Sequence, residues 1–334
     1  MKALVNIVSS DRKEGYNAAG KAKSDVDLTL TQLGYDRKNL VFRRDLPKYI
    51  SLSRHIFDML KLSYEIKSNN YEEVIIQYPG WGIGTRSISM LSKLLKSQPL
   101  TLLIHDIDSL RYFGQLSDRE RRIMNRASKI LVHTENMKKF LEDSGVITPT
   151  KVMELFDYYA NGEVNPQEPS SPYSLVFAGN LKKSEFLQKI GESLSPHTLF
   201  LYGLEVDIRW PENIKYVGKF APDDIDDIKG DWGLVWDGDS VETCSGMVGN
   251  YLQYNSSHKA SLYIASGKPV IVWNKSALAS IVKKYEIGIT VDNLKEVPEK
   301  LNNVDSTRFN EIRKNVLHLS SRLRSGDFLE KTLS

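Results

Sequence analysis

Short apolar runs alternate with longer amphipathic segments along the first half of the chain. The apolar runs predict strands at 4–8, 40–42, 74–78, 100–104 and 129–132. The amphipathic segments predict helices at about 18–33, 51–66, 84–95 and 117–127, and a further helix that starts at 133–135. Because strands and helices alternate, we expect a parallel, doubly wound α/β sheet.

A change of composition divides the chain near its middle. The segment from Tyr158 to Tyr173 holds three prolines and few aliphatic residues, which is typical of a linker. A second alternation follows, with strands at 175–177, 198–201, 214–217, 234–236, 270–273 and 288–291, and a long helix at 306–323.

Two doubly wound domains follow from this division. We expect an N-terminal domain over 1–158, a linker over 159–172, a second domain over 173–310, and a C-terminal helix over 311–334, with packing back on the first domain as one option. Ligands prefer clefts between domains, so we expect an interdomain site.

In the first domain, polar residues follow several predicted strands. The carboxyl ends of parallel strands form one edge, so 9–16, 78–81, 105–111 and 133–134 define a candidate rim. His105 and Asp106 are its most chemically useful pair, since either could take a proton from an acceptor hydroxyl. The alternative is structural, with Asp106 capping a turn and His105 making an internal hydrogen bond. The glycine spacing in the first loop does not match the dinucleotide fingerprint.

The stretch from Gly249 to Trp273 predicts a loop, a helix that ends at a glycine, and a buried strand. Asn255, Ser256 and Ser257 offer side-chain oxygens that could cap the helix. His258 and Lys259 fall in its first turn, beside unpaired N–H groups. Such a helix start suits a phosphate, although an ordinary polar helix end explains the same pattern.

Other polar residues follow strands of the second half. Asn180 and Lys182 come after the first of these strands, and Tyr202 ends the second. Together with the helix start they could hold a base, a ribose and a pyrophosphate. Alternatively, Tyr202 packs the domain edge, and Asn180 and Lys182 form only a polar turn.

Composition narrows the class of protein. With 334 residues, 41% hydrophobic and 26% charged, the chain is typical of a soluble globular protein of two domains. A net charge of +3 is too small to argue for nucleic acid, and no apolar run approaches the roughly 20 residues of a membrane span. The single cysteine, Cys244, fits a reducing cytoplasm, and we expect an inert or modestly exposed thiol rather than a nucleophile.

Six motifs carry a resemblance to a known family. They are GYNAAGKAKSDVD (15–27), QYPGWG (77–82), HDIDSLR (105–111), FAGNLKKS (177–184), LYG (201–203) and GNYLQYNSSHKASLYIASGKPVIVW (249–273). With the two predicted α/β domains, they resemble GT-B glycosyltransferases. More narrowly, the chain resembles the bacterial galactofuranosyltransferase-like family and its glucosyltransferase 3 group, which adds the second sugar to serine-rich-repeat adhesins. The implied fold is GT-B, with two Rossmann-like domains and an interdomain cleft.

The resemblance implies roles for particular residues. Contacts to a UDP-sugar donor fall on Gly15, Tyr16, Asn180, Lys182, Tyr202, Tyr254, Asn255, His258 and Lys259. Many GT-B enzymes bind the ribose through a glutamate of an E-x-x-x-x-x-E segment. Here that segment reads NSSHKAS and has no glutamate, so the ribose must be held otherwise. His105 and Asp106 remain the candidate catalytic pair on the acceptor side.

The implied activity is hexosyl transfer from a UDP-sugar, with glucose first, to a GlcNAc-modified serine-rich-repeat glycoprotein. We expect no cofactor and no metal, although Asp106-Ile107-Asp108 matches a D-x-D pattern. Two alternatives stay open: a galactofuranosyltransferase acting on a cell-surface polysaccharide, and a non-catalytic nucleotide-sugar-binding subunit. The expected partners are the donor, a glycoprotein or glycan acceptor and further copies of the chain. We expect a cytoplasmic location, with peripheral membrane contact at most.

Overall fold

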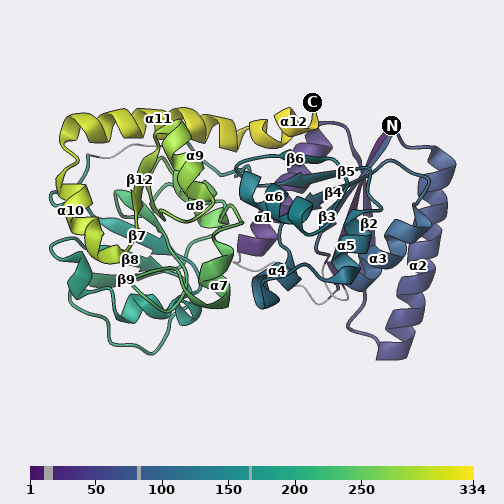
Figure 1. Cartoon of the computed structure of the whole chain (residues 1–334), viewed down its shortest axis with the longest axis horizontal. Coiled ribbons are helices and arrows are strands. Elements are labelled where there is room, and N and C mark those ends of the chain that lie inside the picture. Colours follow the sequence, from purple (N-terminus) through teal and green to yellow (C-terminus); the bar gives the residue numbers. More distant parts are fainter. Residues whose placement is uncertain (11–17, 81–83, 165–167) are drawn as a thin grey trace. The chain divides into compact units, whose positions relative to one another are not determined.

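The computed structural model describes residues 1–10, 18–80, 84–164 and 168–334 (Figure 1). The chain forms two compact units. The first comprises Ala22–Met153 with the beginning of the chain and Leu329–Ser334. The second comprises Glu154–Phe328 together with the start of the first helix, up to Lys21. The predicted limits of the linker and domains remain predictions. The predicted residues Gly15 and Tyr16 lie outside the described part of the chain.

The first unit contains a six-stranded parallel sheet with the order β2-β1-β3-β4-β5-β6. Its strands are β1 (Lys2–Ser9), β2 (Asp36–Phe42), β3 (Glu73–Tyr78), β4 (Leu100–Ile104), β5 (Lys129–Val132) and β6 (Thr150–Val152). The helices between them are α1 (Ala18–Gln32), α2 (Lys48–Asn69), α3 (Gly84–Leu94), α4 (Asp108–Phe113), α5 (Asp118–Met124) and α6 (Glu135–Asp143).

The second unit contains another six-stranded parallel sheet, with the order β12-β11-β10-β7-β8-β9. Its strands are β7 (Leu175–Ala178), β8 (Leu199–Tyr202), β9 (Ile214–Gly218), β10 (Trp232–Val235), β11 (Val270–Trp273) and β12 (Gly288–Val291). Its α-helices are α7 (Gly246–Tyr251), α8 (His258–Ala265), α9 (Leu278–Tyr285), α10 (Val297–Asn302) and α11 (Ser306–Arg324). Short 3₁₀ turns are η1 (Leu181–Lys183), η2 (Glu185–Gln188), η3 (Glu192–Leu194) and η4 (Leu294–Glu296), and α12 (Asp327–Leu333) ends the chain.

The predicted fold class is confirmed, although several short elements were not predicted, among them the helices α4, α9 and α10. Strand β6 was not predicted, because it is only three residues long and its central Lys151 is exposed. Helix α7 forms within a region read partly as loop, where glycines at 246 and 249 weaken the helical pattern. No helix in the described ranges is long and apolar enough to cross a bilayer.

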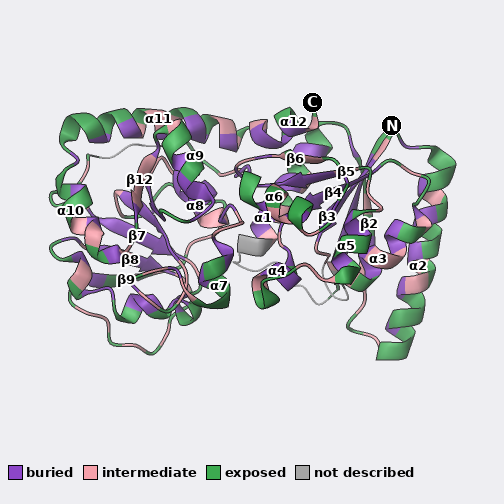
Figure 2. Ribbon diagram, in the orientation of Figure 1, coloured by how far each residue is buried: buried purple, intermediate pink, exposed green. Residues whose placement is uncertain are grey.

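Tyr263 holds helix α8 against the second sheet. Its ring packs on Gly233 of β10, where an added Cβ would come within 2.2 Å of the ring carbons. Its buried hydroxyl accepts a hydrogen bond of 2.8 Å from the backbone N–H of Ala178, at the end of β7. Helix α11 covers α8 from outside, and Figure 2 shows α8 largely buried. The first turn of α8 is therefore fixed relative to the ends of β7 and β10.

Two titratable side chains in the cores cannot ionise readily. Cys244 is 1% exposed, and burial raises the pKa of its thiol, which agrees with the expected inert cysteine. His133 follows β5 and is fully buried, and burial lowers its pKa to about 3.

The buried His133 makes the stability of the protein sensitive to acid. Between pH 6.5 and 3 the unfolded chain binds a proton at this histidine and the folded chain does not, so stability falls as the pH falls. Through this histidine the wild type should lose about 2 kcal/mol of its free energy of unfolding between pH 7 and pH 5, at roughly 1.4 kcal/mol per pH unit. The variant His133→Gln should not show this part of the loss. Urea unfolding followed by circular dichroism at both pH values measures this. His318→Gln, at an exposed position, is the control, and equal pH dependence in the His133 variant would contradict the assignment.

Candidate active site

The strand order of the second sheet creates one special position at its carboxyl edge. Strands β7 and β10 are neighbours although β8 and β9 lie between them in sequence. Connections from β7 and β10 therefore leave in opposite directions along the sheet, and such switch points hold ligands in open α/β sheets. The FAGN segment follows β7, and the loop leading to α8 follows β10.

A glycine lets the ends of β7 and β8 approach each other. A Cβ at Gly203 would lie 2.2 Å from the carbonyl oxygen of Gly179, a distance that no side chain can adopt. The LYG and FAGN motifs therefore meet through their backbones.

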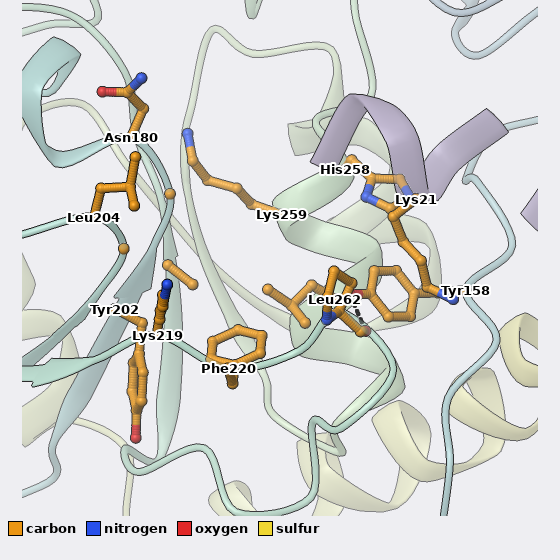
Figure 3. A pocket seen from close by; sticks show the side chains of 14 residues that line it. Lys21, Tyr158, Asn180, Tyr202, Leu204, Lys219, Phe220, His258, Lys259 and Leu262 are labelled. Carbon is orange, nitrogen blue, oxygen red and sulfur yellow. Dashed lines mark hydrogen bonds between the residues drawn. The ribbon is translucent and has the colours of Figure 1, made fainter. Parts of the chain in front are cut away.

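A cavity of about 330 Å³ lies at this edge (Figure 3). Its volume falls within the range of small-molecule sites, whose volumes start at about 300 Å³. It is lined by Lys21, Tyr158, Ala178, Gly179, Asn180, Tyr202, Gly203, Leu204, Lys219, Phe220, Pro222, His258, Lys259 and Leu262. The cavity thus brings together four predicted donor-binding residues: Asn180, Tyr202, His258 and Lys259.

Lys259 is the best-placed cation of the cavity. Its ammonium lies 2.8 Å from both carboxylate oxygens of Asp237, which follows β10, and 5.0 Å from the centre of the Phe177 ring. The two side chains of the ion pair are only 15% and 18% exposed. Lys259 is consequently held in one position, and Asp237 balances its charge.

Sequence reasoning missed a second lysine of this cavity. The ammonium of Lys21 lies 2.6 Å from Asp223 and 5.0 Å from the centre of the Tyr158 ring, and its side chain is 6% exposed. Lys21 belongs to the GYNAAGKAKSDVD motif, so the motif itself was the available signal. Lys219 also lines the cavity, which therefore carries three lysines and suits an anion.

Tyr202 forms part of the wall of the cavity, and its hydroxyl is engaged in a hydrogen bond. Its oxygen accepts a 2.9 Å hydrogen bond from the backbone N–H of Lys229, and its ring meets Phe220 edge-on at 5.3 Å between centroids. Figure 3 shows the hydroxyl pointing away from Lys259. The packing interpretation of Tyr202 is therefore satisfied by the structure, while its ring still lines the cavity.

Asn180 and Lys182 separate in space. The side-chain oxygen of Asn180 accepts a hydrogen bond of 3.1 Å from the backbone N–H of Lys183 and so begins turn η1. Lys182 lies on this turn, is exposed, and is not among the residues that line the cavity. Its predicted contact with a diphosphate stays a prediction.

The start of helix α8 differs in detail from the expected cap. Ser257 occupies the cap position in an extended conformation, but its side chain makes no capping hydrogen bond. Instead the preceding loop carries polar atoms inward. Among the described residues, Asn255 Oδ1 and Ser256 Oγ are buried and have no hydrogen-bond partner. Buried polar atoms without partners are costly, so they indicate a place where a ligand or water completes the structure.

His258 and Tyr254 are placed differently around this helix start. The ring of His258 lies against Tyr158 at 4.9 Å and Phe156 at 5.8 Å between centroids, and it lines the cavity. Tyr254 is half-buried and, like Asn255, is not among the lining residues. The donor contacts of both stay predictions.

In the first unit, His105 sits at the end of a buried polar network. Gln77 donates through Nε2 to Asp27 Oδ1 at 2.6 Å and to Asn6 Oδ1 at 3.1 Å, which fixes the orientation of its amide. Its Oε1 therefore accepts from His105 Nε2, at 2.6 Å. A neutral His105 then carries its proton on Nε2 and has its acceptor at Nδ1.

This network lies at the switch point of the first sheet. Asn6 is on β1 and Gln77 on β3, the two strands between which the chain reverses its direction across the sheet. Burial raises the pKa of Asp27, although hydrogen bonds from Asn6 and the charge of Arg37 oppose this. The network gives His105 a fixed ring orientation just beyond β4.

Asp106 forms an ion pair with Arg111, at the end of helix α4. The carboxylate is therefore engaged by a guanidinium, which makes it a weaker candidate for accepting a proton. Within the described residues, no group of three or more His, Cys, Asp and Glu side chains is arranged to hold a metal ion.

Comparison with known proteins agrees with this geometry. The "Glucosyltransferase 3-like, N-terminal domain" matches residues 4–155, and the "Glucosyltransferase 3-like, C-terminal domain" matches residues 175–334. The chain is 31% identical over 300 residues to the beta-1,6-galactofuranosyltransferase WbbI of Escherichia coli (strain K12), covering 86% of each protein. It is 25% identical to glucosyltransferase 3 of Streptococcus gordonii, covering 98% of this chain and 97% of that protein.

A solved structure shows the same fold. The sucrose-phosphate synthase of Thermosynechococcus elongatus superposes with a TM-score of 0.63 at 11% identity, covering 98% of this chain and 97% of that one. The two parallel α/β sheets are those of the GT-B fold, and the relatives of the chain are glycosyltransferases, so the chain is a GT-B glycosyltransferase. Within that class, the chain belongs to the glucosyltransferase 3-like family.

Proposed function

We propose that this glycosyltransferase moves glucose from UDP-glucose to a GlcNAc-modified serine-rich-repeat glycoprotein. The observation that carries the donor assignment is the cavity at the β7–β10 switch point, where the start of α8 and Lys259 meet. The reaction needs no resident cofactor. We further propose a cytoplasmic location, which the single cysteine favours, and a homo-oligomer, as the resemblance to the glucosyltransferase 3 group implies.

The donor side is suited to a leaving diphosphate. Glycosyl transfer from a UDP-sugar builds negative charge on the diphosphate as the glycosidic bond to it breaks. The N-terminus of α8 supplies backbone N–H groups, and Lys259, held at 2.8 Å from Asp237, supplies a positioned cation. Asn255 Oδ1 and Ser256 Oγ, in the loop before this helix, are buried polar atoms that a water would satisfy; neither residue lines the cavity.

The acceptor side carries the proton-transfer chemistry. An acceptor sugar hydroxyl loses its proton as its oxygen attacks the anomeric carbon. We assign this proton to His105 in preference to Asp106, because the Gln77 amide orients the His105 ring and Arg111 occupies the Asp106 carboxylate; the Nδ1 atom of His105 is buried, so the acceptor must displace its surroundings to reach it.

A second function has its own support. The 31% identity to a beta-1,6-galactofuranosyltransferase favours a galactofuranose donor and a cell-surface polysaccharide acceptor. The proposed contacts of the cavity residues are with the nucleotide part of the donor, so these residues fit either sugar. A non-catalytic nucleotide-sugar-binding subunit remains the third alternative, and it would need no residue in the position of His105.

Thermal shift with a panel of UDP-sugars tests the donor. A ligand that binds only the folded state stabilises it by about 2.7 kcal/mol at one hundred times its dissociation constant. We expect a rise in the melting temperature with UDP and UDP-glucose, transfer of glucose to a GlcNAc-bearing serine-rich peptide, and no comparable rise with ADP-glucose. A rise with UDP-galactofuranose and not with UDP-glucose would support the second function. No rise with any uridine nucleotide would reject both.

Substitutions of Lys259 and Asp237 test the diphosphate contact. If Lys259 binds the diphosphate, Lys259→Ala should weaken UDP affinity by about tenfold or more, since a hydrogen bond to a charged group contributes about 1.5–3 kcal/mol. Asp237→Asn should instead strengthen it, because the lysine no longer shares its charge with a carboxylate. Isothermal titration calorimetry measures both.

The double variant Lys259→Ala with Asp237→Asn is the matched control. It removes the unpaired carboxylate that the single lysine substitution leaves behind, so it separates loss of the cation from repulsion by Asp237. We expect it to bind UDP more weakly than Asp237→Asn alone. If the lysine and aspartate substitutions weaken UDP equally, the pair is structural and the phosphate role of Lys259 is wrong.

Comparing His105→Gln with Asp106→Asn tests the acceptor-side assignment. Loss of a general base lowers turnover by about 10²–10⁴-fold. We expect such a loss in His105→Gln with unchanged UDP affinity, and a decrease of less than about tenfold in Asp106→Asn. Steady-state transfer assays with calorimetry provide both quantities. A larger loss in the Asp106 variant would reverse the two roles.

A further inference from the structure

Helix α2 of the first unit has two apolar faces, of which only one is covered. Its inner face packs on β2 and α3 and consists of Ser51, His55, Met59, Leu62, Ser63 and Ile66. His55 anchors this face, because its Nε2 lies 2.9 Å from Ser87 Oγ and its ring meets the Phe42 ring edge-on. The helix is therefore held in one rotational position, and its outer face is a fixed surface.

The outer face carries large apolar side chains in helical register. Tyr49, Phe57, Leu60 and Tyr64 are 73%, 65%, 46% and 76% exposed. They follow one another along one side of the helix, over about 22 Å at 1.5 Å per residue. Leu52 and Ile50 are also exposed beside them, at 44% and 41%. In Figure 2, exposed residues recur along the whole of α2. We call Tyr49, Phe57, Leu60 and Tyr64 the outer stripe.

A surface helix ordinarily presents polar residues on this side. Contiguous exposed apolar groups of this size mark a surface that binds something. No residue of the stripe lines the cavity, so the donor site does not account for it.

The charges around the outer stripe indicate the charge of the partner that binds there. The exposed charged residues of α2 are all basic: Lys48, Arg54, Lys61 and Lys67. Its acidic residues are only half-exposed, and one of them, Glu65, is paired with Lys38. A second copy of the chain docking by the same face would bring like charges together, which is unfavourable. The occupant should therefore be anionic as well as apolar.

An anionic lipid surface meets both requirements. A helix with aromatic and aliphatic residues flanked by Lys and Arg lies in the plane of the membrane interface, with its apolar side at the boundary of headgroups and acyl chains. Tyrosine is enriched at that depth, because its ring is apolar and its hydroxyl remains hydrated. A bilayer surface also adapts to a convex helix, whereas a protein partner would need a matching groove.

We propose that helix α2 docks the enzyme on membranes rich in anionic lipids. The outer stripe enters the interface, and Arg54, Lys61 and Lys67 contact the headgroups. This inference concerns the first unit alone and does not depend on the identity of the donor sugar.

Vesicle flotation with the full chain tests the proposal. We expect the protein to float with vesicles of 70% phosphatidylcholine and 30% phosphatidylglycerol, and to float poorly with phosphatidylcholine alone. Raising the salt should weaken binding, since the attraction of basic residues to anionic headgroups is screened. The double variant Phe57→Ser with Tyr64→Ser should lower the partition coefficient by at least about tenfold, because burial of each large apolar side chain is lost.

Two further variants complete the test. Lys61→Gln should reduce partitioning by about fivefold, the effect of one basic residue near the surface. Ile147→Ser, at a position of the first unit that is 85% exposed and outside α2, should leave partitioning unchanged. Far-ultraviolet circular dichroism confirms that each variant is folded.

Two results would overturn the proposal. The first is a wild-type chain that floats with neither lipid composition. The second is a Phe57→Ser, Tyr64→Ser variant that floats like the wild type. If that variant instead changes the mass measured by light scattering while the wild type does not float, a second copy occupies the stripe and the membrane assignment is wrong.

Discussion

The contact between Tyr263 and the end of β7 is the interaction on which the donor side depends. It joins the middle of α8 to a strand 85 residues away through the hydrogen bond from the Ala178 N–H. The same ring needs the bare backbone of Gly233 on β10. Because both sides of the switch point are tied to one side chain, the first turn of α8 cannot shift without breaking a buried hydrogen bond. This arrangement therefore fixes the position of Lys259.

The sequence was sufficient for the architecture because the strands are short and apolar on both faces. The expected strands at 100–104, 129–132, 270–273 and 288–291 have the observed limits. Covered parallel strands are continuous apolar runs, and these stand out against polar loops. The edge strand β6 did not stand out, since an edge needs little burial and admits an exposed lysine.

The site was less predictable, because it depends on pairs of residues that are distant in sequence. A strand-end rule selected Asn180, Tyr202, His258 and Lys259, and the structure gathers them around one cavity. The rule could not show that Asp237 pairs with Lys259 or that Tyr202 directs its hydroxyl away. Periodicity could not reveal the outer stripe of α2 either. A helix that is apolar on two sides and a helix that is apolar on one side are both predicted simply as helices.

Asp237 gives the Lys259 ammonium a partner in the protein itself, at 2.8 Å. When a bound anion leaves the site, the carboxylate of Asp237 therefore still balances the charge of the lysine. In the proposed reaction, which leaves a spent nucleoside diphosphate in every cycle, the carboxylate would pair with the lysine again as the product leaves. The pair would then shorten the residence time of the product and lower its affinity, which favours turnover where release of the nucleotide is the slow step.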